Sequence, residues 1–232
     1  MPRPTPDWFD RLPTDRPIAE FSVWSARLLH LADELQRITP HAHLLHLDVA
    51  DGHFGPAFLL FPDLVAQVRA ASALPLHVHL MVKDEILLAQ VEQFADAGAD
   101  VITVHAECLS AGAAVRRIRE RGLLAGLVLG VETPTSTFEA FLPDIHFATL
   151  LGTAIGVKGK GLHERALDRL RETRAMITGQ ELDHRVVLVA DGGIRHETVP
   201  LLRAAGAEAV VLGSLAFGDP DLAQRMAWLA TQ

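Results

Sequence analysis

Eight short apolar runs recur along the 232-residue chain, and most of the segments between them show helical periodicity. Each run has the length of an ordinary strand and is too short for a buried helix. Strands are predicted at residues 18–24, 43–50, 76–82, 101–107, 124–130, 145–152, 185–191 and 208–214. Helices are predicted at 26–37, 84–97, 110–121, 162–177, 197–205 and 220–229, with Asp84 as the N-cap of the second.

The order of these elements restricts the fold class. The phrases at 97–101 and 205–209 each read as a helix end, a glycine turn and the start of a strand. Strands that alternate with helices favour a parallel sheet, and eight units in this length predict a single (β/α)8 TIM barrel. The rival is an open doubly wound sheet, but its usual Gly-x-Gly-x-x-Gly after the first strand is missing.

Composition and charge restrict the partners and the cellular location expected for this barrel. Residues 1–17 are Pro-rich and charged, so they are predicted to be an N-terminal extension, and residues 18–232 the barrel domain. The net charge of -8 with scattered basic residues argues against a nucleic-acid partner. No secretory signal and no membrane-length apolar stretch is present, and the single Cys108 excludes an intrachain disulfide. A cytoplasmic protein without a membrane partner is the expectation.

Polar residues gather at the carboxyl ends of the predicted strands, where barrels of this kind carry their active sites. His46 and Asp48 share one face of the second strand because side chains alternate along a strand. Asp191 ends the seventh strand and Ser22 lies on the first. The third strand contributes three residues on one face, which are His77, His79 and Met81.

A His-x-Asp pair taken alone is usually a hydrogen-bonded structural pair. Two imidazoles and two carboxylates that point into one barrel instead form a divalent-cation site by type and number. The predicted ligands are His46, Asp48, His79 and Asp191, with His79 preferred over His77 because it lies nearer the strand end. His105 and Glu107 on the fourth strand have two possible roles. They could support the metal ligands through hydrogen bonds, or they could form an internal hydrogen-bonded pair, and the internal pair is favoured.

Glycine-rich loops after the last strands are candidate phosphate sites, because bare backbone amides there commonly hold phosphate. They contain Gly192, Gly193, Gly213 and Ser214. The flexible basic loop 152–161 is predicted to close over an anionic substrate with Lys158 or Lys160 as counter-charge, and a solvated loop is the alternative.

These residues, in this order, resemble the ribulose-phosphate 3-epimerase family. The matching phrases begin at His46 (His-Leu-Asp-Val-Ala-Asp-Gly-His-Phe-Gly-Pro) and His77 (His-Val-His-Leu-Met-Val). Further matches are the phrases at 97–105, 191–194 and 213–217, so the resemblance runs from about residue 21 to residue 218.

The resemblance implies a metal-dependent epimerase that acts on a ketose phosphate by 1,1-proton transfer through an enediolate. It implies that Asp48 and Asp191 are the acid–base pair, and that His46, Asp48, His79 and Asp191 bind the metal, with zinc expected first and iron(II), manganese or cobalt as alternatives. It also suggests a homo-oligomer. The substrate-binding residues expected on this basis are Ser22, His79, Met81, Gly156, Lys158, Gly159, Gly192, Gly193, Gly213 and Ser214.

The sequence departs from the family pattern around the substrate. Ala50 and Leu151 replace methionines, and Trp24 stands where a smaller or acidic residue is expected. The sixth loop reads Ile155-Gly-Val-Lys-Gly-Lys instead of a sequence near Pro-Gly-Phe-Gly-Gly-Gln. Metal and acid–base residues that survive beside an altered loop suggest a related ketose phosphate as substrate. The alternatives are an aldose–ketose sugar-phosphate isomerase and a non-catalytic sugar-phosphate-binding barrel. A lyase of the same superfamily fits less well, because the segment 48–51 lacks the lysine of its Asp-x-Lys-x-x-Asp cluster.

Overall fold

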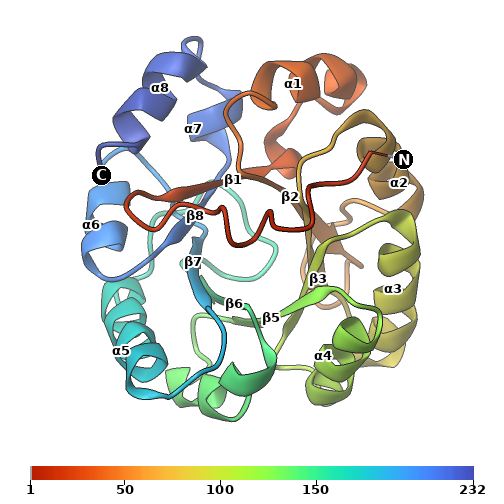
Figure 1. Ribbon diagram of the computed structural model, residues 1–232, viewed down its shortest axis with the longest axis vertical. Helices are drawn as coiled ribbons and strands as arrows, with labels where there is room; N and C mark the ends of the chain where they lie inside the picture. Colours follow the sequence, from red (N-terminus) through yellow and green to blue (C-terminus); the bar gives the residue numbers. More distant parts are fainter. Residues whose placement is uncertain (1) are drawn as a thin grey trace.

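Eight parallel strands close into one barrel in the computed structural model, which describes residues 2–232. Neighbours in the barrel are neighbours in the chain, from β1 to β8 and back to β1. Figure 1 shows the strands at the centre and the helices in a ring around them. The strands are β1 (Ile18–Ser22), β2 (Leu44–Ala50), β3 (Leu76–Met81), β4 (Val101–His105), β5 (Leu124–Leu129), β6 (Phe147–Leu151), β7 (Val187–Asp191) and β8 (Ala209–Leu212).

The helices cover the outer face of the barrel. They are α1 (Leu31–Ile38), α2 (Pro62–Ala71), α3 (Asp84–Ala97), α4 (Ala111–Glu120), α5 (Ala166–Gly179), α6 (Val199–Ala204), α7 (Ser214–Phe217) and α8 (Leu222–Leu229). Four 3-10 turns accompany them: η1 (Val23–Ser25), η2 (Leu28–His30), η3 (Thr135–Ala140) and η4 (Leu142–Asp144). Among residues 2–232, no helix combines the length and the apolar character needed to cross a bilayer.

The barrel confirms the predicted fold class, and several helix predictions need correction. α2 was not predicted, and the segment after β5 forms only the turns η3 and η4. The helix predicted at 26–37 begins five residues late, because Ala26 and Arg27 have extended conformations. Asp84 is not the N-cap of α3; Lys83 occupies that position, and the Asp84 carboxylate instead accepts hydrogen bonds from Ser110 N (2.8 Å) and Oγ (2.6 Å).

Two glycines end helices as the recurring phrases predict. Gly98 follows α3 with φ of 103° and donates its N–H to the carbonyl of Ala95. Gly206 follows α6 with φ of 110°. This left-handed region is costly for residues that carry a Cβ, so glycine allows the chain to turn directly into β4 and β8.

Apolar residues form two separate clusters. They leave the barrel interior polar at its carboxyl end, which is termed the upper end. The larger cluster lies between the outward faces of the strands and the helices, with Leu45, Leu47 and Val78 among its strand residues. The smaller cluster fills the amino end of the barrel interior and contains Val101, Phe147, Val187, Val189, Ala209 and Val211. The polar residues of β1, β2, β3 and β7 therefore lie above an apolar floor.

The segment before β1 lies across the amino end of the barrel (Figure 1). Leu12 is 6% exposed and belongs to the floor cluster, and the Phe9 ring lies 5.6 Å from that of Phe147. Arg185 of the barrel donates to the carbonyl oxygens of Leu12 (3.1 Å) and Pro13 (3.0 Å). This segment thus contributes to the core. Met1 lies outside the described residues, and the division into 1–17 and 18–232 stays a prediction.

Candidate active site

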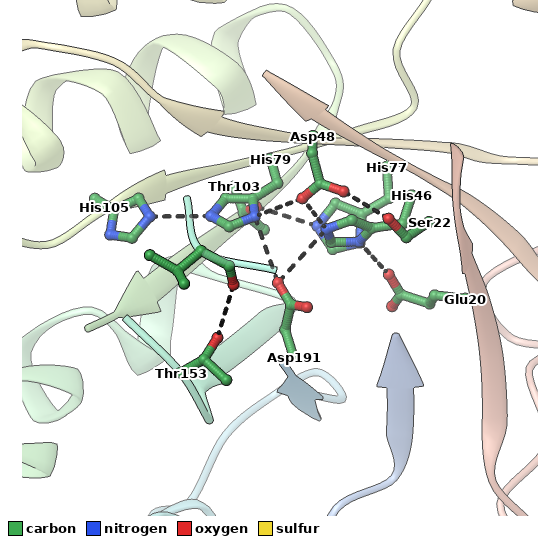
Figure 2. A network of polar contacts seen from close by, with 11 residues as sticks. Glu20, Ser22, His46, Asp48, His77, His79, Thr103, His105, Thr153 and Asp191 are labelled. Atoms are coloured by element: carbon green, nitrogen blue, oxygen red, sulfur yellow. Dashed lines mark hydrogen bonds and ion pairs between the residues drawn. The ribbon is translucent and has the colours of Figure 1, made fainter. Parts of the chain in front are cut away.

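The polar residues of β1, β2, β3 and β7 meet inside the carboxyl end of the barrel (Figure 2). Strand register places Asp48 beside His79. Asp191 is the last residue of β7, so it lies at the same carboxyl end of the barrel. One ligand atom from each of four residues lies within 4.8 Å of the others. These four are the predicted ligands His46, Asp48, His79 and Asp191.

The distances within this group fit a shared cation better than hydrogen bonds. Asp48 Oδ1 lies 3.4 Å from both His46 Nε2 and His79 Nδ1, and Asp191 Oδ2 lies 3.8 Å and 3.6 Å from the same two nitrogens. Among the described residues neither nitrogen has a hydrogen-bond partner, although both are buried. Two ligands of a tetrahedral ion with bonds of about 2.1 Å lie about 3.4 Å apart. The donor set and its spacing therefore fit a divalent metal.

The two carboxylates have different proton affinities. Burial raises the pKa of Asp48, but the charges and contacts of His46 and His79 outweigh burial and leave that pKa well below its usual value. Burial also raises the pKa of Asp191, the adjacent Asp48 charge raises it further, and the pKa stays above its usual value despite His46. The two carboxylates thus differ in proton affinity, as the members of acid–base pairs do.

His77 lies below this group and does not take part in it. Its Nδ1 lies 2.8 Å from Glu20 Oε2 and its Nε2 lies 3.2 Å from Thr103 Oγ1. Of the two competing histidines, His79 is the one that faces Asp48 and Asp191.

A chain of contacts runs from His79 towards the loop after β5. His79 Nε2 lies 3.0 Å from His105 Nε2, and His105 Nδ1 lies 3.0 Å from Glu107 Oε2. Glu107 Oε1 accepts from Gly130 N (2.8 Å) and from the hydroxyl of Thr133. Burial lowers the pKa of His105 to about 4, so the neutral ring donates to Glu107 and accepts from His79. The internal pair His105–Glu107 therefore also orients His79, with its Nδ1 lone pair towards the carboxylates.

A cavity of about 220 Å³ opens above the cluster. It is lined by Asp48 and Asp191 and by every residue predicted to bind substrate: Ser22, His79, Met81, Gly156, Lys158, Gly159, Gly192, Gly193, Gly213 and Ser214. Ser22 Oγ donates to Asp48 Oδ2 at 2.7 Å. The cavity thus joins the carboxylate pair to the glycine loops that were predicted to hold phosphate.

Lys158 reaches over this cavity from the loop after β6. Its Nζ donates to the carbonyl oxygen of Trp24 at 3.1 Å and lies 5.3 Å from the centre of the Trp24 ring. Burial lowers the pKa of Lys158, and the Asp48 charge opposes that shift. Lys160, the alternative counter-charge, is not among the lining residues.

Sequence reasoning missed several residues of the cavity wall. Arg195, Thr153 and Ser25 line the cavity, and Trp24 had been noted only as a departure from the family pattern. The sequence indicated a place for Arg195 at the cavity only through its position directly after the Gly-Gly-Ile segment that follows β7. Thr153 and Ser25 carried no signal of their own, because their positions depend on how loops far apart in sequence meet.

Comparison with known proteins gives three findings. The model of the Ribulose-phosphate 3 epimerase family matches residues 18–217. A curated "Ribulose-phosphate 3-epimerase" of Bacillus subtilis is 34% identical over 202 residues (86% of this chain, 92% of the relative), and that of Escherichia coli is 33% identical over 205 residues (86% and 88%). Among solved structures, 3-keto-L-gulonate-6-phosphate decarboxylase from Vibrio cholerae superposes with a TM-score of 0.69 at 17% identity (92% of this chain, 95% of that one), which is a likeness of fold.

Proposed function

The chain belongs to the ribulose-phosphate 3-epimerase family, and on that premise we propose that it is an isomerase that inverts the carbon next to the ketone of a ketose phosphate. The observation that carries this proposal is the pair Asp48 and Asp191, brought together beside His46 and His79 at one cavity. Inversion requires one group that removes a proton from one face of the carbon and another that returns a proton to the opposite face.

We propose that the metal ligands are His46 Nε2, Asp48 Oδ1, His79 Nδ1 and Asp191 Oδ2. Two imidazole nitrogens and two carboxylate oxygens suit zinc first, and iron(II), manganese or cobalt accept the same donors. A divalent ion bound there would stabilise the negative charge that develops on the substrate oxygens.

The protein's own groups carry the proton. Asp48, whose pKa is lowered, is the carboxylate ready to accept it, and Ser22 keeps Asp48 oriented through the bond to Oδ2. Asp191, which has the higher proton affinity of the two carboxylates, is the group that would deliver a proton to the opposite face. The roles exchange in the reverse reaction, which passes through the same enediolate.

The phosphate end of the substrate is assigned to the other side of the cavity. The loops after β7 and β8 offer backbone amides at Gly192, Gly193, Gly213 and Ser214. Lys158 and Arg195 add positive charge at the same cavity. A phosphate held on that side would leave the ketone beside Asp48 and Asp191.

The substrate class that the family supports is a pentulose phosphate. We propose that the altered loop around Lys158 and the smaller Ala50 shift the preference towards a related ketose phosphate. The contact of Lys158 with Trp24 supports this proposal, because it places on the cavity wall two side chains that the family pattern does not carry there.

The test is isotope exchange from solvent. The purified protein is incubated in D₂O with ribulose 5-phosphate, xylulose 5-phosphate or a hexulose 6-phosphate, each with zinc, iron(II), manganese or cobalt. Deuterium at the carbon next to the ketone, together with the epimeric ketose, supports the proposal. An aldose product would instead indicate an aldose–ketose isomerase. Tight binding without exchange in any combination would indicate a non-catalytic sugar-phosphate-binding barrel.

Two further expectations belong to this proposal. The protein is expected to form a homo-oligomer, which sedimentation velocity of the purified chain measures directly. The division between residues 1–17 and the barrel of residues 18–232 is tested by removing the first segment. Because Leu12 packs into the barrel floor, we expect a loss of stability in the shortened chain.

A further inference from the structure

A second polar cluster lies beneath the proposed metal site and is fully enclosed by the barrel (Figure 2). Its centre is Glu20 on β1, whose side chain has no exposed surface. A single oxygen, Glu20 Oε2, lies 2.9 Å from His46 Nδ1 and 2.8 Å from His77 Nδ1. His77 Nε2 continues the chain to Thr103 Oγ1 at 3.2 Å. Only His46 belongs to both this cluster and the ligand group.

The chemistry of Glu20 determines where the neighbouring hydrogens lie. An ionised carboxylate can only accept hydrogen bonds, so both imidazoles must carry a hydrogen on Nδ1. Both Nδ1 atoms lie within hydrogen-bond distance of the same oxygen, as expected for a carboxylate that accepts from each ring. In the neutral ring that metal binding requires, the lone pair is then on His46 Nε2, the nitrogen that faces Asp48 and Asp191.

We infer that Glu20 is a positioning residue that fixes the tautomer and the ring orientation of His46 for metal binding, and that His77 and Thr103 hold Glu20 in place. The inference rests on the proposed function, because it assumes that His46 is a ligand. A carboxylate that accepts from the far nitrogen of a ligand imidazole also makes the ligating nitrogen more basic.

The same atoms fit a hydrogen-bonded support better than a second metal site. Glu20, His46 and His77 have the residue types of a ligand set. Their separations of 2.8 and 2.9 Å are ordinary hydrogen-bond lengths. Ligands of one tetrahedral ion would stand about 3.4 Å apart, as the four atoms of the upper group nearly do. Glu20, His46 and His77 are also all 0% exposed, which leaves an ion no direct route from solvent.

Stability alone gives no reason for a carboxylate at this position. Glu20 Oε1 is buried without a hydrogen-bond partner among residues 2–232. An unsatisfied buried oxygen costs free energy, and well-packed apolar residues commonly replace buried ionic groups without loss of stability. A buried carboxylate that the fold does not require, in direct contact with a proposed ligand imidazole, is expected where it serves the site.

The arrangement repeats around the other imidazole ligand. His79 Nε2 contacts His105, which in turn contacts the carboxylate of Glu107. Both proposed imidazole ligands therefore have their far nitrogen tied to a chain that contains a carboxylate. For His46 the carboxylate is in direct contact, so its removal should have the more immediate effect.

The test compares Glu20→Gln and Glu20→Leu with the wild-type protein. Glutamine keeps the shape and one accepting oxygen but loses the charge, and leucine removes the acceptor. The metal-free proteins are titrated with zinc against a chromogenic chelator, and the visible spectrum of each cobalt(II)-loaded protein is recorded. We expect the zinc dissociation constant to rise roughly 10- to 100-fold, more for leucine than for glutamine, with a changed cobalt spectrum.

Leu12→Ala is the matched control, because Leu12 is buried in the barrel floor and lies in the segment before β1, far from the proposed ligands in sequence. It should lower the melting temperature while leaving the zinc dissociation constant and the cobalt spectrum unchanged. Thr103→Val, which removes only the last donor of the chain, should weaken zinc binding less than Glu20→Gln does. If Glu20→Leu does not fold, Glu20→Gln and Thr103→Val decide the question.

The outcomes separate the two proposals. Zinc affinity within twofold of wild type in Glu20→Gln overturns the positioning role. Two zinc ions per wild-type chain, of which one is lost in Glu20→Gln, also overturn it and identify the cluster as a second metal site. Wild-type protein that binds none of the four metals overturns the proposed function itself, and that result is visible without any variant.

Discussion

Replacement of Asp191 with asparagine would test the proposed acid–base pair most directly. Asparagine has nearly the same shape, so the cavity wall is preserved while the proton-transfer group is removed. Such a group contributes roughly 10²- to 10⁴-fold to a rate, which corresponds to about 3–5 kcal/mol in the activation barrier. Asp191 Oδ2 lies 3.6 and 3.8 Å from His79 and His46, so the variant is also expected to bind metal less tightly. The rate must therefore be measured at saturating metal.

The assay follows proton exchange separately from each epimer. Asp191→Asn and Asp48→Asn are each incubated in D₂O with one pure epimer, and NMR records both deuterium uptake and the second epimer. Each variant retains one base, so each should exchange the proton of only one epimer, and the two variants should select opposite epimers. Asp183→Asn is the control, because Asp183 is an exposed carboxylate whose side chain is 97% accessible.

Two results would refute this reasoning. If Asp191→Asn epimerises within about threefold of the wild-type rate at saturating metal, Asp191 does not transfer the proton, since the expected loss is at least roughly 10²-fold. If both variants exchange the same epimer, a single base serves both faces and the opposed arrangement is wrong.

Three further predictions follow from other parts of the structure. Lys158→Met should raise KM for the phosphorylated substrate roughly fivefold, because an exposed charge about 4 Å from a phosphate contributes about 1 kcal/mol. The variant should also show a weaker salt dependence of KM. A KM and a salt dependence equal to those of the wild-type protein would count against contact between Lys158 and the phosphate. Dialysis against a chelator should abolish isotope exchange, and zinc, iron(II), manganese or cobalt should restore it; full activity without metal would exclude the proposed ligand role. The pKa of Glu208 is lowered in the folded protein, because the effect of Arg174 and Arg185 outweighs that of burial, which raises it. Glu208 therefore stabilises the fold above its unfolded pKa of about 4.5, and this stabilisation is lost as the pH falls through the lowered folded pKa. Glu208→Gln should therefore cost about 1–3 kcal/mol in urea unfolding at pH 7, with the difference disappearing at acid pH; a pH-independent difference would contradict the ion-pair explanation.

The strands were predictable because each is a short apolar run with both faces buried. No predicted strand end differs from the observed one by more than two residues. The helices were less predictable, because periodicity alone does not show where a loop stops. α2 begins with Pro62 at its first turn, a start signal that the apolar periodicity did not bring out. After β5 the chain is rich in threonine and serine, and only 3-10 turns form there.

At both ends of the barrel, the contacts that could not be predicted from the sequence join segments that lie far apart in the chain. Composition suggested that residues 1–17 lie outside the fold, yet Leu12 is buried in the floor. The bond from Arg185 to the Leu12 carbonyl joins residues 173 positions apart, and no local pattern contains that information. The same holds for the cavity wall, where Trp24 and Lys158 meet from loops 134 positions apart.

The grouping of the candidate site residues was predictable for a reason that also explains the one ambiguity among them. Inward residues on a strand recur every second position, about 6.6 Å apart along the strand. Register pairs Asp48 with His79, and His46 with His77 one step lower. Position on the strand therefore favours His79 over His77 but does not by itself explain why His46 takes part. His46 reaches the upper group because its Nε2 points to Asp48 and Asp191 while its Nδ1 is held by Glu20 below. The proposed ligand set thus spans two levels of the barrel, so an account of the proposed metal site that omits the buried carboxylate beneath it leaves the orientation of one proposed ligand unexplained.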